Sequence, residues 1–185
     1  MRKQLLDSRI IIFTILCGSL CTIILGFIFF QFRIFNIHDP LFQFLAYGIV
    51  GSVAFALFLQ RRYRDAVFAL ILLFVLNVIV AGIYRFTLLV THSFFFLAMV
   101  FSILFFERHF YGKMANIEIA RPIVLAGIIT IAFLLVSPIL RLLFYSSEGQ
   151  FHFFSNMPVG FLIGLGLGIG FEVSKFLYSR QADSP

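Results

Sequence analysis

An acidic residue at the end of an apolar stretch is the first candidate for chemistry in this sequence. Glu172 follows the glycine-rich run "PVGFLIGLGLGIGF", and Lys175 comes three residues later, within reach on the same helical face. A carboxylate in an apolar environment is costly unless it pairs or has a function, so Glu172 could bind a proton or a cation that drives transport. The alternative is an interfacial ion pair with Lys175 that fixes the end of the helix. We favour the ion pair because the carboxylate lies near the end of the stretch.

Two further polar residues lie within or beside apolar stretches. Asn77 is the deepest strongly polar residue, and its ordinary use is a hydrogen bond between helices, with the lining of a polar pathway as the alternative. Arg141 follows Pro138, which should kink its helix and release a backbone carbonyl. Together with Glu172 and Lys175, these two residues are the candidate transport or coupling residues.

A third set of polar residues lies towards the other ends of the stretches. Three of the four histidines belong to it, and their convergence would create a pH-sensitive site for a metal ion or an anionic solute. The residues of this outer polar cluster are His38, Asp39, Arg85, His92, Glu148 and His152. They come from separate segments, and no spacing in the sequence requires them to meet. We therefore assign no metal ligand.

Motifs of catalysis are missing from the sequence. It contains no H-E-x-x-H, no aspartate-rich pair for a metal-bound diphosphate and no G-x-S-x-G. We therefore predict no catalytic residue and no cofactor.

The elements that must position these residues are apolar throughout. Hydrophobic residues make up 62% of the 185 residues and charged residues 12%, with 28 phenylalanines and no tryptophan. The charged fraction is about half that of a soluble domain. A chain of this length cannot build a core large enough to hide so much apolar surface. The composition therefore predicts an integral membrane protein that has the lipid bilayer as its first partner.

Six stretches are long enough to cross about 30 Å of hydrocarbon as helices. They cover residues 9–30, 40–59, 66–84, 88–106, 121–144 and 158–178. The third and fourth stretches could be separated at either of two positions: by a turn at Arg85 and Phe86, or by a break between Thr91 and Ser93. We predict an all-α polytopic membrane protein in which residues 1–185 form a single domain, with six transmembrane helices in one bundle.

The basic residues are unevenly divided between the two sides of this bundle. Three lie on one side, namely Arg33, Arg85 and Arg141. Eleven lie on the other: Arg2, Lys3, Arg9, Arg61, Arg62, Arg64, Arg108, Lys113, Arg121, Lys175 and Arg180. Basic loops stay in the cytoplasm, so we expect both termini there, and a bacterial cytoplasmic membrane fits this pattern. The net charge of +6 is spread over short loops and predicts no nucleic-acid partner.

Five glycines near the C-terminus form two stripes on a helix. Gly160, Gly164 and Gly168 share one face, and Gly166 and Gly170 lie on nearly the opposite face. In lipid, small residues four apart let helix backbones approach closely, so we expect this helix to pack between two neighbours. A hinge is the alternative. The spacing G-x-G-x-x-G is absent, which excludes a nucleotide-binding loop.

Similar spacing recurs in the first two stretches. Small residues stand four apart at Gly18, Thr22 and Gly26, and again at Gly48, Ser52 and Ala56. These faces are candidate partners for the last helix or contact faces for another subunit.

These observations predict a non-enzymatic membrane protein that serves as a helical-bundle component of a larger membrane assembly or transport system. We expect its partner to be another membrane protein or a second copy of the chain. A small solute or ion transporter that uses the intramembrane polar residues is the first alternative. A membrane-embedded lipid-modifying enzyme is the second.

Overall fold

The computed structural model describes residues 8–31, 40–84, 86–114, 120–143 and 156–182, and every element in these ranges is helical. The helices are α1 (Ser8–Gln31), α2 (Pro40–Leu59), α3 (Tyr63–Tyr84), α4 (Phe86–Phe106), the π-helix η2 (Glu107–Tyr111), α5 (Ala120–Leu143) and α6 (Asn156–Ala182). The predicted all-α fold is confirmed. The end of α3 at Tyr84 and the start of α4 at Phe86 select the first of the two expected boundaries. No break occurs between Thr91 and Ser93, which lie inside α4.

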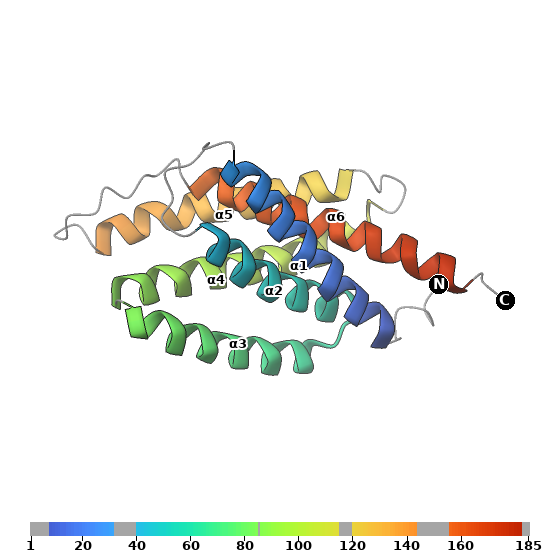
Figure 1. The fold of residues 1–185 in the computed structure, drawn as a ribbon, viewed down its shortest axis with the longest axis horizontal. Coiled ribbons are helices and arrows are strands. Elements are labelled where there is room, and N and C mark those ends of the chain that lie inside the picture. Colours follow the sequence, from blue (N-terminus) through green and yellow to red (C-terminus); the bar gives the residue numbers. More distant parts are fainter. Residues whose placement is uncertain (1–7, 32–39, 85, 115–119, 144–155, 183–185) are drawn as a thin grey trace.

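The helices lie side by side, with α6 between α1 and α5 (Figure 1). Helix α1 also packs against α2, and α4 packs against α5, α3 and α2. Helix α3 lies at the edge of the molecule, where α2 and α4 are its main neighbours. Helix α6 is therefore central in the bundle, and helix α3 is peripheral.

The outer surface of the molecule is apolar between its ends. Four helical segments in the described ranges are long and apolar enough to cross a membrane: Arg9–Phe29, Val90–Tyr111, Ala120–Leu140 and Met157–Ser179. Helix α2 adds the shorter apolar segment Phe44–Leu59. Large apolar side chains point outward, and Phe68 on α3 is 73% exposed. Such a surface suits a protein whose solvent is lipid.

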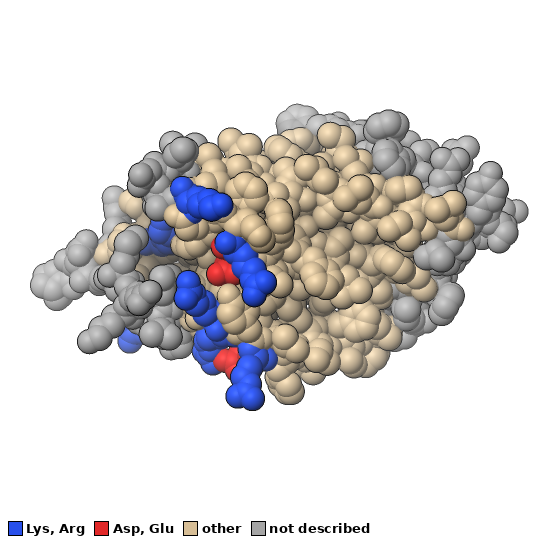
Figure 2. Space-filling view, turned by 180° about the vertical axis from the view of Figure 1, so that it is seen from behind, with Lys and Arg blue, Asp and Glu red and all other residues tan. Residues whose placement is uncertain are grey.

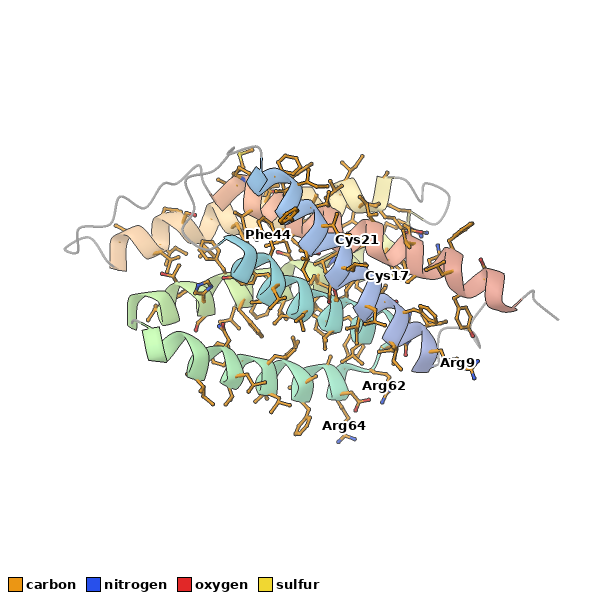
Figure 3. All side chains as sticks on the ribbon, viewed as in Figure 1. Arg9, Cys17, Cys21, Phe44, Arg62 and Arg64 are labelled. Carbon is orange, nitrogen blue, oxygen red and sulfur yellow. The ribbon has the colours of Figure 1, made fainter. Side chains whose placement is uncertain are left out.

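Charged side chains gather at one end of this surface (Figure 2). Arg9 at the start of α1 lies at the same end as Arg62 and Arg64, which flank the start of α3 (Figure 3). We refer to this as the basic end of the molecule. The ends of α2, α4 and α6 and the start of α5 also lie there (Figure 1).

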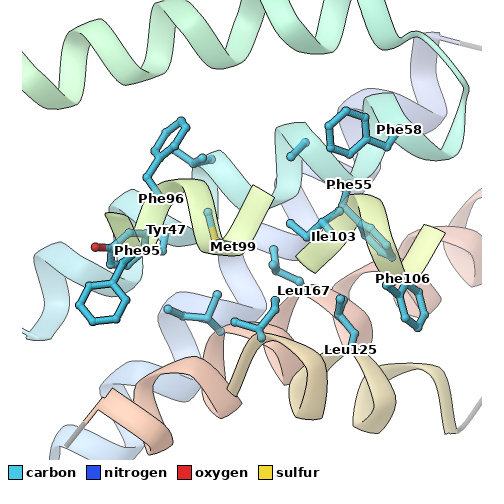
Figure 4. Packing of buried hydrophobic residues seen from close by; sticks show 14 of the residues in the cluster. Tyr47, Phe55, Phe58, Phe95, Phe96, Met99, Ile103, Phe106, Leu125 and Leu167 are labelled. Carbon is cyan, nitrogen blue, oxygen red and sulfur yellow. The ribbon is translucent and has the colours of Figure 1, made fainter. Parts of the chain in front are cut away.

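The interior is filled by large apolar side chains from α2, α4, α5 and α6 (Figure 4). The ring of Phe55 lies edge-on to that of Phe171, with 5.2 Å between centroids, and Phe95 and Phe133 approach to 4.7 Å. Met99 and Leu167 are almost completely buried between these aromatic groups. The described part of the bundle therefore has a close-packed core.

Glycine allows backbone contact along two faces of α6. On one face, Gly160, Gly164 and Gly168 lie against Thr130, Ala126 and Pro122 of α5. On another, Gly166 and Gly170 lie against Thr22 and Gly18 of α1, and Ser174 is hydrogen-bonded to Thr14 at 3.1 Å. Each step of four residues along α6 is matched by a step of four residues backward along its neighbour. The two expected neighbours of the last helix are therefore α5 and α1.

The same register continues from α1 to α2. Gly18 lies against Ser52, Thr22 against Gly48 and Gly26 against Phe44. Gly18 and Thr22 thus contact both α2 and α6. The small residues of the first two stretches serve contacts within this chain.

We expect Gly164→Ala to destabilise the bundle. An added Cβ would lie 2.5 Å from the Cα of Ala126, so two backbones would have to separate. Overpacking of this kind costs about 1–3 kcal/mol. Thermal unfolding of the detergent-solubilised protein would measure the loss. Gly127→Ala is the control, because its Cβ would enter open space. Equal melting temperatures for the two variants would contradict the close contact of α5 and α6.

Candidate functional site

Glu172 is the centre of an ion cluster at the basic end of the molecule. Its Oε1 accepts a hydrogen bond from Nη1 of Arg121 at 3.1 Å, and its Oε2 accepts one from Nζ of Lys175, also at 3.1 Å. The Arg121 side chain is only 7% exposed, compared with 21% for Glu172 and 30% for Lys175. One carboxylate thus bridges two cations, and the more buried cation comes from a different helix.

Aromatic rings and a backbone carbonyl complete the surroundings of this cluster. The Arg121 guanidinium lies 5.0 Å from the ring centroid of Tyr111, and its Nε donates to the carbonyl of Met114 at 3.2 Å. The Lys175 ammonium lies 5.8 Å from the ring of Phe171, which meets Tyr111 edge-on. Cation–π contacts stabilise the two cations where water is partly excluded. The cluster therefore connects η2, α5 and α6.

The role of Arg121 was missed in the sequence. We had counted it among the loop cations, but it lies in the first turn of α5 and is buried against Glu172. Its position follows from the glycine register, since Gly168 lies against Pro122 and Glu172 is one turn further along α6. If the last two predicted helices are paired antiparallel along the glycine face, Arg121 comes level with Glu172, and this was the signal in the sequence for the ion pair.

We expect Glu172→Gln to destabilise the protein strongly. The substitution removes the carboxylate that pairs with the buried Arg121 guanidinium, and breaking a buried ion pair costs about 3–5 kcal/mol. Asp65→Asn is the matched control, because the Arg62–Asp65 pair is about half exposed, and such surface pairs contribute about 0–1 kcal/mol. Unfolding measured in detergent should separate the two variants clearly. A small and equal loss for both would show that Arg121 does not depend on Glu172.

A second buried polar pair joins α2 and α4. The Tyr47 hydroxyl and the Nδ1 of His92 are 2.7 Å apart, and both side chains are buried. The Tyr47 ring also meets Phe133 of α5 edge-on at 6.0 Å. His92, a predicted member of the outer polar cluster, therefore pairs with α2 inside the bundle.

The remaining members of the outer polar cluster lie outside the described residues: His38, Asp39, Arg85, Glu148 and His152. Arg141 belongs to α5, but its side chain is also outside the described part. Their convergence stays a prediction. Within the described ranges, no group of three or more His, Cys, Asp or Glu residues could hold a metal ion.

Asn77 lines a cavity of about 290 Å³ between α2, α3 and α4. The other lining residues are Leu45, Ala46, Tyr47, Ile49, Val50, Leu73, Leu76 and Phe96. Leu45 and Leu76 are also exposed on the outer surface, so the cavity lies beside the lipid-facing side of the molecule. The Asn77 amide makes no hydrogen bond within the described part of the chain. We call this feature the Asn77 groove.

Gln60 is a buried polar residue at the end of α2. Both its Nε2 and its Oε1 are buried, and neither has a hydrogen-bond partner among the described residues. An unsatisfied buried amide costs about 1–3 kcal/mol. No feature of the sequence distinguished Gln60 from a solvated residue of a polar turn.

We expect Gln60→Leu to raise the stability of the protein by about 1–3 kcal/mol. Leucine has a similar size and removes the unsatisfied amide. The midpoint of thermal unfolding in detergent would report the gain, with Gln60→Glu as a comparison that should lower it. A loss of stability in Gln60→Leu would mean that the amide has a partner beyond the described residues.

The helical fold, the apolar exterior and the charges at one end define the class as helical integral membrane protein. Comparison of the chain with protein-family models, with curated proteins and with solved structures gives no significant match. Its function must therefore be argued from its own residues.

Proposed function

We propose that the protein is a six-span bundle that acts as a non-enzymatic component of a larger membrane assembly or transport system. The proposal rests on a closed interior. Large apolar side chains fill it, and α6 contacts α1 and α5 at backbone level. Its main polar groups are engaged with each other in the Glu172 cluster and the Tyr47–His92 pair. Such an interior leaves the outer surface as the place where the protein acts.

The basic end supports a cytoplasmic location for both termini. The Lys and Arg side chains that the structure describes all belong to helix ends or turns at this end: Arg9, Arg61, Arg62, Arg64, Arg108, Lys113, Arg121 and Lys175. A bias of this kind keeps the basic side in the cytoplasm, and a bacterial cytoplasmic membrane is compatible with it. In this orientation α1, α3 and α5 run outward, and α2, α4 and α6 run inward.

The Asn77 groove is the observation that carries the partner proposal. An amide in hydrocarbon is costly when it is unpaired, and interhelical hydrogen bonds are its usual solution. The groove is lined mostly by apolar side chains of α2, α3 and α4, and Leu73, Leu76 and Asn77 of the peripheral helix α3 form one side of it. A transmembrane helix of another protein, or of a second copy, would fill the groove and pair with the amide.

Transport of a small solute or ion is the alternative function. Among the described residues, it depends on the buried polar pairs. The Tyr47–His92 pair provides a proton-exchanging group within the bundle. Glu172, however, is held by two cations near the basic end. A coupling carboxylate has to release its partners in each cycle, whereas this arrangement favours a fixed ion pair.

A photoreactive residue at position 76 would test the partner proposal. Leu76 lines the Asn77 groove and is 49% exposed, and Leu135 on α5 is a control that is 64% exposed. We expect a discrete protein crosslink in native membranes from position 76 and lipid adducts alone from position 135. Asn77→Leu should weaken the crosslink about threefold or more, since membrane hydrogen bonds contribute about 0.6–1.7 kcal/mol.

Two results would contradict this proposal. Lipid adducts at both positions would show that no helix fills the groove. Specific uptake of a solute by vesicles that contain the purified protein alone would establish the transport alternative. Native mass spectrometry of the detergent extract would then identify the bound small molecule.

A further inference from the structure

Three arginines at the basic end have no salt bridge within the described residues: Arg61, Arg64 and Arg108. Arg61 lies in the turn between α2 and α3, Arg64 in the first turn of α3, and Arg108 in η2. By contrast, Arg62 of the same turn is paired with Asp65. We call these three residues the basic turn patch.

Tyr63 holds the two parts of the patch together. Its hydroxyl donates to Oε2 of Glu107 at 3.3 Å, which connects the start of α3 with η2. Burial and the Glu107 carboxylate raise the pKa of Tyr63, while the nearby positive charges of Arg61 and Arg108 oppose this change. Arg61 is two residues before Tyr63 and Arg108 directly follows Glu107, so the Tyr63–Glu107 hydrogen bond brings the two arginine-bearing segments together. The π-helix, a rare geometry that is frequent at functional sites, positions one of them.

Arg61 adopts a backbone conformation that normally belongs to glycine. Its φ is 58°, and the described part of the chain has no other non-glycine residue with positive φ. Arg61 N–H donates to the carbonyl of Phe58 at 2.8 Å, and Arg62 N–H to that of Leu57 at 3.0 Å. These two bonds form a Schellman motif, whose left-handed position usually holds glycine. A cation kept at a strained position indicates that its charge has a use.

The patch lies where the lipid-facing surface ends. Val67 and Phe68, one turn beyond Arg64, are both exposed apolar residues. Phe105, just before η2, is also exposed. Cations at this level face the phosphates of the adjacent leaflet rather than the bulk solution. The apolar residues beside them suit acyl chains better than they suit an acidic protein segment.

We propose that the basic turn patch binds the phosphate of an anionic phospholipid, with Arg61, Arg64 and Arg108 as its donors. The inference rests on the membrane placement proposed above, in which the basic end faces the cytoplasm. The phosphate lies between the α2–α3 turn and η2, and the acyl chains of the lipid lie along the exposed face of α3.

The test uses the full-length protein in vesicles of phosphatidylcholine with increasing phosphatidylglycerol. Native mass spectrometry after extraction would measure how strongly the protein retains phosphatidylglycerol relative to phosphatidylcholine. We expect a preference for phosphatidylglycerol that falls about fivefold for each arginine removed in Arg61→Gly and Arg108→Gln. Glycine adopts the φ of position 61 without strain, so Arg61→Gly should fold at least as well as the parent protein. Arg62→Gln is the control and should retain the preference.

Other outcomes would exclude either the lipid site or the membrane placement. Equal retention of both lipids by the parent protein would exclude the lipid site. So would full displacement by free glycerol phosphate, which would indicate an anion site without a lipid. An unchanged preference for phosphatidylglycerol in Arg61→Gly and Arg108→Gln would show that the basic turn patch does not bind the lipid. Failure of the protein to remain in vesicles after carbonate washing would instead refute the membrane placement itself.

Discussion

The backbone contact of α6 with α1 and α5 is the constraint on which the rest of the structure depends. In lipid, burial of apolar surface does not drive helices together, so close packing must do so. Gly164 and Gly170 permit this because a Cβ at either position would collide with a neighbouring backbone. These contacts fix the observed register of α6 against α5 and α1, in which Gly164 lies against Ala126 and Gly170 against Gly18. Once that register is fixed, the positions of all other groups on these helices follow.

The ion cluster is the clearest consequence of this register. Gly168 lies against Pro122, so the next turn of α6 brings Glu172 level with the start of α5, where Arg121 is buried. On the α1 side, the same helix turn brings Ser174 to Thr14. The polar groups of α6 therefore meet partners where its glycines end. The close packing of small residues thus gives these buried charges a fixed geometry.

Much of this fold could be predicted from the sequence, but the rotation of each helix could not. Length and composition predict apolar helices, and the spacing of Gly160, Gly164 and Gly168 predicts close packing. Apart from the glycine faces, the helices are apolar on every side, so the pattern contains no further information about which face is buried. Hence the sequence predicts neither the contact of His92 with Tyr47 nor the ion pair of Arg121 with Glu172. The positive φ of Arg61 arises from the way in which α2 ends. An arginine at this position does not predict such a helix end.

Helix α3 differs from the other helices in its few neighbours and in two polar side chains that make no hydrogen bond or salt bridge within the described part of the bundle. Its neighbours are mainly α2 and α4, and none of the described glycine contacts that join α1, α2, α5 and α6 involves it. Within the described residues, its polar groups Asn77 and Arg64 contribute no hydrogen bond or salt bridge to the bundle. A membrane helix gains little from polar groups that face no partner. Both proposed contacts involve this helix: Asn77 belongs to the contact with a partner helix, and Arg64 to the contact with a lipid phosphate. In the proposed function, α6 and its neighbours form the closely packed part of the bundle, and α3 forms the edge that takes part in recognition.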